Sequence, residues 1–206
     1  QYPLFKKKEQ HIIRAAQKLL ENINLKVASN PQIEINRSSI QIAIQKFKIL
    51  NSKINILLGI GGSGPTKRIP ADKFKKFISL VDKDYECTFY LATGKNEEEQ
   101  VILKDILSSH KDLCVALDNY TISEILPVIK SCRISICNDS SFSHLSAALN
   151  IPTIVLMSDT PLLYGSYSPN MYPIVPDGIE NVSHNSRGKE KINPEKIYNK
   201  FKSIIS

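Results

Sequence analysis

Two loops of this sequence carry small polar and charged residues in arrangements that suit phosphate binding. The first is glycine-rich, runs from Gly59 to Pro70, and offers the hydroxyl groups of Ser63 and Thr66 and the ammonium group of Lys67. Glycine lets a backbone approach a phosphate closely, hydroxyl groups donate hydrogen bonds, and lysine supplies a compact positive charge. We therefore expect this loop to bind an anion such as a diphosphate. The alternative is a glycine-rich turn with a surface lysine.

The second loop lies between a short apolar run, Ile134–Cys137, and a helical pattern over Phe142–Asn150. A strand that ends in small polar residues where a helix begins presents free backbone N–H groups, and such helix N-termini bind anions. The candidate ligand contacts here are Asp139, Ser140, Ser141 and His144. The alternative is that Asn138, Asp139 and Ser140 only cap the helix.

The hydrophobic pattern of the chain predicts a scaffold that brings these loops together. Strand-like apolar runs occur at Ile54–Ile60, Cys87–Thr93, Leu113–Leu117, Ile134–Cys137, Thr153–Met157 and Tyr172–Val175. Helical patterns separate or follow them at Ala71–Val81, Glu97–Ser109, Ser123–Cys132, Phe142–Asn150 and Asn193–Ile204. Strands that alternate with helices of this length indicate βαβ units, and therefore a doubly wound parallel sheet of the α/β, Rossmann-like class.

That fold class predicts where a ligand binds. In the common strand order 3-2-1-4-5-6 the first and fourth strands are neighbours, and the ligand crevice lies beyond their carboxyl ends. The glycine-rich loop follows the first predicted strand, and the Asp139 loop follows the fourth. We therefore expect both loops to form a single site.

The glycine-rich loop matches two phosphate-binding motifs only in part. Gly59, Gly61 and Gly64 form a GxGxxG pattern. A dinucleotide site needs its helix to begin within the glycines, but Pro65 and Pro70 delay the helix until about residue 71. Pro65 also stands where a P-loop has its lysine. The loop is therefore expected to bind phosphate without being either motif.

Composition favours a globular chain with a sizeable core. Of the 206 residues 42% are hydrophobic, and no apolar run approaches the roughly 20 residues that span a bilayer. The cysteines show no metal-ligand spacing and are expected to be reduced thiols of a cytoplasmic protein: Cys87, Cys114, Cys132 and Cys137. The net charge of +7 indicates a polyanionic partner. Because basic clusters such as Lys6–Lys8 lack interleaved aromatic residues, no nucleic-acid partner is expected.

The first quarter of the chain is too small for a separate domain. Helical patterns cover Lys8–Asn22 and, from a cap at Ser38, residues to about Leu50. We expect residues 1–53 to form a linker and packing helices, and residues 54–206 to form the Rossmann-like domain.

The order of these features resembles glycosyltransferase family 9, the heptosyltransferases of lipopolysaccharide core assembly. The resemblance covers roughly residues 54–167. It is most specific in Asn138-Asp-Ser-x-x-x-His-Leu-x-Ala-Ala-Leu-x-x-Pro152. It implies a GT-B architecture of two Rossmann-like domains, of which this chain resembles the carboxyl-terminal, donor-binding one. The amino-terminal acceptor domain would then lie outside this sequence.

The resemblance also implies roles for individual residues. The expected contacts to the donor diphosphate and sugar are Ser63, Thr66, Lys67, Asp139, Ser140, Ser141 and His144. Glu97 would contact the ribose and Ile122 the adenine, although an acidic first turn of a helix explains the run Glu97–Glu99 equally well. Because Lys67 would offset the charge on the departing nucleotide, no metal or other cofactor is expected.

Two residues depart from the family pattern. Ser141 stands where the family has a glycine, and crowds a place where the backbone should approach phosphate. The family's Gly-Pro-Thr segment reads Ser158-Asp159-Thr160, which puts a carboxylate near an anionic ligand. Both departures bear on the identity and affinity of the donor more than on the fold.

The resemblance implies the donor-binding half of an inverting glycosyltransferase. Its donor would be ADP-heptose and its acceptor a lipid-linked oligosaccharide at the cytoplasmic face of the inner membrane, with peripheral contact to anionic lipid. The family's general base is an aspartate of the amino-terminal domain, and Glu9, Glu21 and Glu34 belong to no βα unit that could replace it. We therefore expect no catalytic base in this chain and no transfer without the missing half. The alternative is a non-catalytic nucleotide- or polyanion-binding module.

Overall fold

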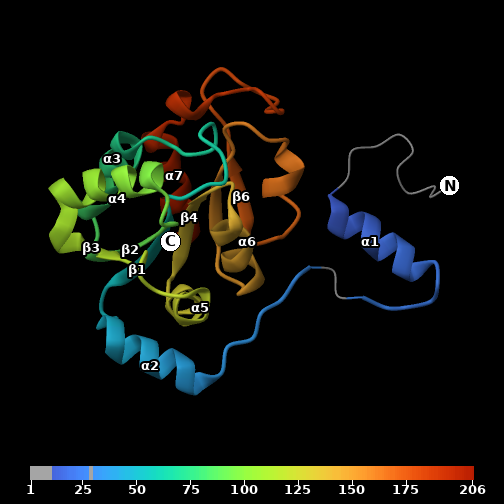
Figure 1. Cartoon of the computed structure of the whole chain (residues 1–206), viewed down its shortest axis with the longest axis horizontal. Helices are drawn as coiled ribbons and strands as arrows, with labels where there is room; N and C mark the ends of the chain where they lie inside the picture. The colour runs from blue at the N-terminus through green and yellow to red at the C-terminus, as the bar shows by residue number, and fades with distance from the viewer. Residues whose placement is uncertain (1–10, 28–29) are drawn as a thin grey trace.

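A computed structural model of the chain describes residues 11–27 and 30–206, built around a parallel sheet (Figure 1). The sheet has six strands in the order β3-β2-β1-β4-β5-β6. The strands are β1 (Ile54–Gly59), β2 (Cys87–Ala92), β3 (Cys114–Ala116), β4 (Ile134–Asn138), β5 (Thr153–Leu156) and β6 (Met171–Ile174). Every neighbouring pair is parallel. The predicted doubly wound α/β fold is confirmed, and with it the 3-2-1-4-5-6 order.

Helices cover both faces of this sheet. One layer contains α3 (Ala71–Asp82), α4 (Glu97–His110) and α7 (Pro194–Ile205), and the other contains α2 (Arg37–Phe47), α5 (Ile122–Lys130) and α6 (Ser141–Ala148). Short 3-10 turns lie at Lys111–Leu113, Leu162–Gly165 and Lys189–Lys191. The first helix, α1 (Ile12–Glu21), lies apart from both layers at the side of the molecule (Figure 1).

Strand β1 illustrates why the strands are continuous apolar runs. Ile56 and Leu58 pack in the layer with α3, α4 and α7, whereas Leu57 packs in the opposite layer. All three side chains are fully buried. Because successive residues of a strand face opposite sides, a sheet covered on both sides needs apolar residues at every position. The continuous runs in the sequence are therefore the signature of this buried parallel sheet.

Several predicted boundaries differ from the observed ones. The predicted cap of α2 at Ser38 is wrong: the helix begins at Arg37, and the side chain of Asn36 accepts a hydrogen bond from the Ser39 amide. Helix α6 ends at Ala148, and Asn150 then has a positive φ of 61°. The predicted start of the first helix at Lys8 and the Lys6–Lys8 cluster lie outside the described residues, as does Glu9.

The cysteines are all free thiols. Cys87, Cys132 and Cys137 are buried and Cys114 is partly buried. Burial raises the pKa of Cys87 to about 12, and burial likewise raises that of Cys114 to about 12. These groups therefore pack as small apolar side chains rather than as reactive thiolates. Among the residues that the structure describes, no helix combines the length and apolar composition that a membrane crossing requires.

The aromatic core between α3, β2 and α7 leads to a first prediction, about the stability of the fold. The fully buried ring of Phe77 meets those of Phe89 and Phe201 edge to face, with ring centroids 6.4 and 5.9 Å away. Replacement Phe77→Ala leaves a cavity there and should lower the free energy of unfolding by about 3–5 kcal/mol, as measured by urea denaturation. The control Val101→Ala, at a side chain that is 61% exposed on α4, should change it by less than about 0.5 kcal/mol. Equal effects of the two replacements would contradict this assignment of the core.

Candidate functional site

The two polar loops meet beyond the carboxyl ends of β1 and β4. The strands are paired so that Gly59 lies opposite Cys137. The buried side chain of Asn138 then donates to the carbonyl oxygens of Ile60 and Gly61, at 2.8 and 3.2 Å. Asn138 therefore joins the end of β4 to the start of the glycine-rich loop. The structure thus brings the two loops together where the fold class predicts, beyond the ends of β1 and β4.

A pocket with a cavity volume of about 420 Å³ opens between these loops and the residues that follow β2. Its lining comprises Gly61, Gly62, Ser63, Thr93, Gly94, Glu99, Ile122, Ser140, Ser141 and Phe142. Four of the residues predicted for the site, Ser63, Ile122, Ser140 and Ser141, are therefore brought together in one cavity. Lys67, Asp139 and His144 lie beside the pocket rather than in its lining, and they interact with one another.

Two polar atoms at the end of β4 are buried and lack a partner among the described residues, the side-chain oxygens Oδ1 of Asn138 and Oγ of Ser140. Ser140 occupies the N-cap position of α6, yet its side chain makes no capping hydrogen bond. Capping alone therefore does not explain this residue. Buried polar groups are nearly always hydrogen-bonded, so an unpaired hydroxyl at a pocket wall suits a group that bonds to a ligand.

Asp139 is a buried carboxylate with two donors. Its Oδ2 atom accepts hydrogen bonds from Lys67 Nζ at 2.9 Å and from Thr160 Oγ1 at 2.5 Å. The side chain of Asp139 is only 6% exposed, whereas that of Lys67 remains 26% exposed. A buried charge is tolerated when it is paired and hydrogen-bonded. The ion pair therefore fixes the position of Lys67 while leaving its side chain partly exposed.

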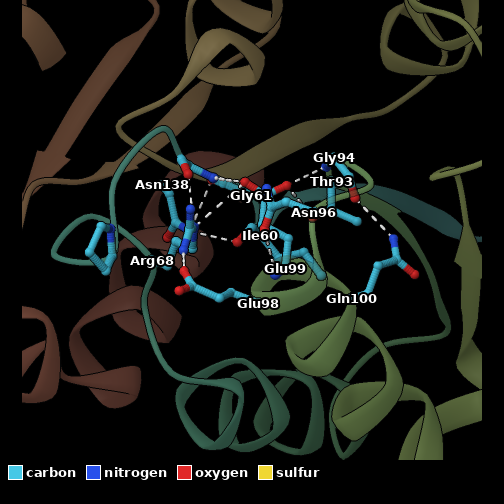
Figure 2. A network of polar contacts seen from close by, with 12 residues as sticks. Ile60, Gly61, Arg68, Thr93, Gly94, Asn96, Glu98, Glu99, Gln100 and Asn138 are labelled. Carbon is cyan, nitrogen blue, oxygen red and sulfur yellow. Dashed lines mark hydrogen bonds and ion pairs between the residues drawn. The ribbon is translucent and has the colours of Figure 1, made fainter.

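Glu99, rather than Glu97, reaches the site (Figure 2). Its Oε1 atom accepts from the amide of Gly62 at 2.9 Å, and its Oε2 atom accepts from the amide of Gly94 at 2.5 Å and from Thr93 Oγ1 at 3.1 Å. Glu97 is exposed in the first turn of α4 and does not line the pocket. Burial alone would raise the pKa of Glu99, but hydrogen bonds led by that of the Gly62 amide hold the pKa below its ordinary value.

Arg68 completes the contacts around the glycine-rich loop (Figure 2). Its Nε atom donates to the carbonyl oxygen of Gly62 at 2.9 Å and lies 3.6 Å from Glu99 Oε1. Its guanidinium group also forms an ion pair with Glu98. Sequence reasoning gave no role to Arg68, although it stands in the glycine-rich loop, or to Thr160, although it stands at the threonine of the family's Gly-Pro-Thr segment. Glu99 had a usable signal, since it lies four and seven residues before the buried Leu103 and Ile106, on the same face of α4.

His144 lies in the first turn of α6, and its Nδ1 atom is 2.9 Å from the hydroxyl oxygen of Tyr167. Burial lowers the pKa of His144, the nearby Asp139 opposes that effect, and the charge of Lys67 adds to it. The imidazole is therefore neutral near pH 7. The structure thus brings three of the predicted contacts, Lys67, Asp139 and His144, into one electrostatic group.

Asp159 has partners of its own. Its Oδ1 atom accepts a hydrogen bond from the backbone amide of Arg187 at 2.7 Å. Burial acts to raise its pKa, but that bond, a hydrogen bond from the side chain of Thr66 and the charges of Arg187 and His184 together lower it. The carboxylate therefore ties the glycine-rich loop to the loop that contains Arg187, and it does not line the pocket.

Over residues 11–27 and 30–206, no group of three or more His, Cys, Asp and Glu side chains is arranged to hold a metal ion. Positive charge beside the pocket comes from Lys67 and Arg68, and the amino-terminal end of α6 adds a partial positive charge. Together with the small polar lining, they suit a ligand that is anionic at one end.

Comparison with known proteins finds related sequences along most of the chain. The family described as glycosyltransferase family 9 (heptosyltransferase) matches residues 3–200. Lipopolysaccharide heptosyltransferase 1 of Campylobacter coli is 28% identical over 150 residues, which make up 70% of this chain and 44% of that protein. The chain thus spans less than half the length of the curated relatives that it matches.

Solved structures share the fold. A glycosyltransferase family 9 protein from Veillonella parvula has a TM-score of 0.78 at 16% identity, over 97% of this chain and 61% of its own. The Escherichia coli heptosyltransferase WaaC, determined with ADP, has a TM-score of 0.67 at 16% identity, over 96% of this chain and 57% of its own. At such identities the likeness establishes the fold, which is that of the Rossmann-like halves of GT-B glycosyltransferases.

The environment of Glu99 predicts a pH dependence of stability. Because its pKa is lower in the folded state, ionised Glu99 stabilises the fold above the unfolded-state value of about 4.3. That stabilisation is lost as the pH falls through the lower folded-state value. Urea denaturation between about pH 6 and pH 3 should therefore show a smaller loss of unfolding free energy for Glu99→Gln than for the unmodified chain.

The matched control for this experiment is Glu97→Gln, which changes an exposed carboxylate in the same helical turn. Its pH profile should follow that of the unmodified chain. If Glu99→Gln and Glu97→Gln behaved alike, Glu99 would not be the carboxylate that stabilises the loop.

Proposed function

This chain belongs to glycosyltransferase family 9, and we propose that it is the donor-binding half of an inverting heptosyltransferase. The donor that we propose is a nucleotide-diphosphate sugar, ADP-heptose. The main observation behind the proposal is that the glycine-rich loop, which contains Lys67, and the Asp139 loop meet around one pocket. ADP is the ligand named for the structurally similar WaaC, which supports the choice of nucleotide.

The lining of the pocket combines apolar and polar groups. Ile122 and Phe142 supply apolar surface for an adenine ring. Ser63, Ser140 and the amino-terminal end of α6 supply hydrogen-bond donors for phosphate oxygens, and Lys67 lies beside them. We assign the ribose contact to Glu99 in place of Glu97, because Glu99 lines the pocket.

Lys67 is proposed to stabilise the leaving group. Attack of an acceptor hydroxyl on the anomeric carbon breaks the bond between that carbon and the diphosphate, and the electron pair stays on the departing ADP. A lysine already held in place can offset this charge without reorganising, so the chain's own residues account for leaving-group stabilisation. The hydroxyl proton would go to a base outside this chain, as the family resemblance implies.

The remaining parts of the proposal concern the whole enzyme. Residues 54–206 would form the donor domain and residues 1–53 the linker to an amino-terminal acceptor domain. The acceptor would be a lipid-linked oligosaccharide of lipopolysaccharide at the cytoplasmic face of the inner membrane. The positive net charge of the chain would favour peripheral contact with anionic lipid there.

The competing function is that of a non-catalytic nucleotide- or polyanion-binding module. Both functions require that the pocket bind a nucleotide, so binding alone does not separate them. An experiment that joins this chain to the amino-terminal domain of a related heptosyltransferase would separate the two functions. Transfer of heptose by the joined protein supports the enzyme, whereas nucleotide binding without transfer supports the module.

The first test is calorimetric titration with ADP. The unmodified chain should bind ADP saturably, and Lys67→Ala should bind at least tenfold more weakly, a loss of about 1.4 kcal/mol. The control Lys73→Ala removes a lysine from α3, outside the pocket lining, and should leave the affinity unchanged. Absence of saturable binding by the folded chain would contradict the proposed function. Equal binding by Lys67→Ala would contradict the role of Lys67.

A further inference from the structure

Three aromatic side chains form a continuous row from the amino-terminal segment to the proposed phosphate site. His11 stacks on Tyr167 with ring centroids 4.2 Å apart and planes 23° apart. The rings of Tyr167 and His144 also stack, with centroids 5.6 Å apart and planes 20° apart. The hydroxyl oxygen of Tyr167 and Nδ1 of His144 are 2.9 Å apart, so a hydrogen bond joins them.

Tyr167 is held from several sides. Arg14 donates a hydrogen bond to its backbone carbonyl oxygen at 2.8 Å. Its side chain packs against a small apolar cluster under β5 and β6, formed by Ala147, Val155, Met157 and Met171. His11 is fixed in turn, because its Nδ1 atom accepts from the Ile13 amide at 3.2 Å, as the N-cap of α1. The phenol is therefore presented to His144 at a defined position.

We propose that Tyr167 is a positioning residue, whose hydroxyl donates to Nδ1 of His144 and thereby holds the imidazole in the tautomer with its proton on Nε2. The inference rests on the proposed function, because it makes His144 a neutral hydrogen-bond donor for an anionic oxygen at the Lys67–Asp139 site. A neutral imidazole has one donor nitrogen and one acceptor nitrogen, so occupying Nδ1 as the acceptor decides which nitrogen can donate.

The groups around His144 agree with this direction of the hydrogen bond. Titratable groups from three segments of the described chain face His144. They are Asp139 at the end of β4, Lys67 in the glycine-rich loop and Tyr167 in the loop before β6, and His11 lies beyond Tyr167. Burial raises the pKa of Tyr167, which keeps the phenol protonated and able to donate. Burial lowers the pKa of His144, which keeps Nδ1 free to accept.

A purely structural role for Tyr167 predicts something different. If the row of rings only filled space, removal of the hydroxyl would alter stability but would leave the tautomer of His144 as it was. The state of the two ring nitrogens therefore separates positioning from packing. This measurement needs no ligand.

The test is long-range proton–nitrogen NMR of the full chain labelled with ¹⁵N. The chain has four histidines, and the signals of His144 are assigned by their loss in His144→Gln. In the unmodified chain Nε2 should carry the proton and Nδ1 should not. Tyr167→Phe should convert this single state into a mixture of both tautomers, whereas the control Tyr164→Phe, which removes a hydroxyl three residues away, should not. A protonated Nδ1 in the unmodified chain, or no change in Tyr167→Phe, would overturn the proposal.

Titration with ADP then tests the functional consequence. The affinity of Tyr167→Phe should be roughly fivefold lower than that of the unmodified chain, and Tyr164→Phe should bind normally. If the unmodified chain binds no ADP, the proposed function fails, while the NMR result still decides the role of Tyr167. If ADP binds the unmodified chain and Tyr167→Phe equally well, the donor role of His144 fails and the proposed function stands.

Discussion

The glycine-rich loop has no regular secondary structure, and its shape depends on two buried carboxylates, Glu99 and Asp139. Glu99 accepts the amides of Gly62 and Gly94, and Asp139 accepts the ammonium group of Lys67. A loop of this kind would otherwise sample many conformations, because glycine restricts the backbone least. Two charge-assisted anchors confine it, one from α4 and one from the end of β4.

The anchors also explain why small residues are needed at particular points. A Cβ atom added at Gly94 would lie 2.5 Å from Oε2 of Glu99, and one added at Gly61 would lie 3.0 Å from the same atom. Any larger residue would push the carboxylate away from the amides that it holds. The glycines beside Glu99 therefore serve the carboxylate that shapes the loop, as well as any ligand that approaches its backbone.

The sequence predicts the sheet and the meeting of the two loops because both follow from local patterns. Apolar runs and helical periodicity give the alternation of elements, and the parallel order then places the ends of β1 and β4 side by side. Thr160 and Tyr167 could not be predicted in the same way. Their contacts with Asp139 and His144 depend on how the segments after β5 fold back. Local patterns do not record that path, even though Thr160 stands at the threonine of the family's Gly-Pro-Thr segment. The sequence could have identified Glu99 rather than Glu97 as the buried glutamate, because helical periodicity places Glu99 with Leu103 on the buried face of α4.

The carboxylate of Asp139 raises a question for any anionic ligand, since like charges repel. The number of hydrogen-bond donors on Lys67 explains how the site can still bind an anion. An ammonium group has three donors, and one of them is directed to Asp139. With a side chain that is still 26% exposed, Lys67 can bond to a phosphate oxygen without leaving Asp139. Thr160 adds a second donor to that carboxylate, which spreads its charge over two partners. Asp139 thus holds the cation in place before a ligand arrives, and that reduces the ordering cost of binding.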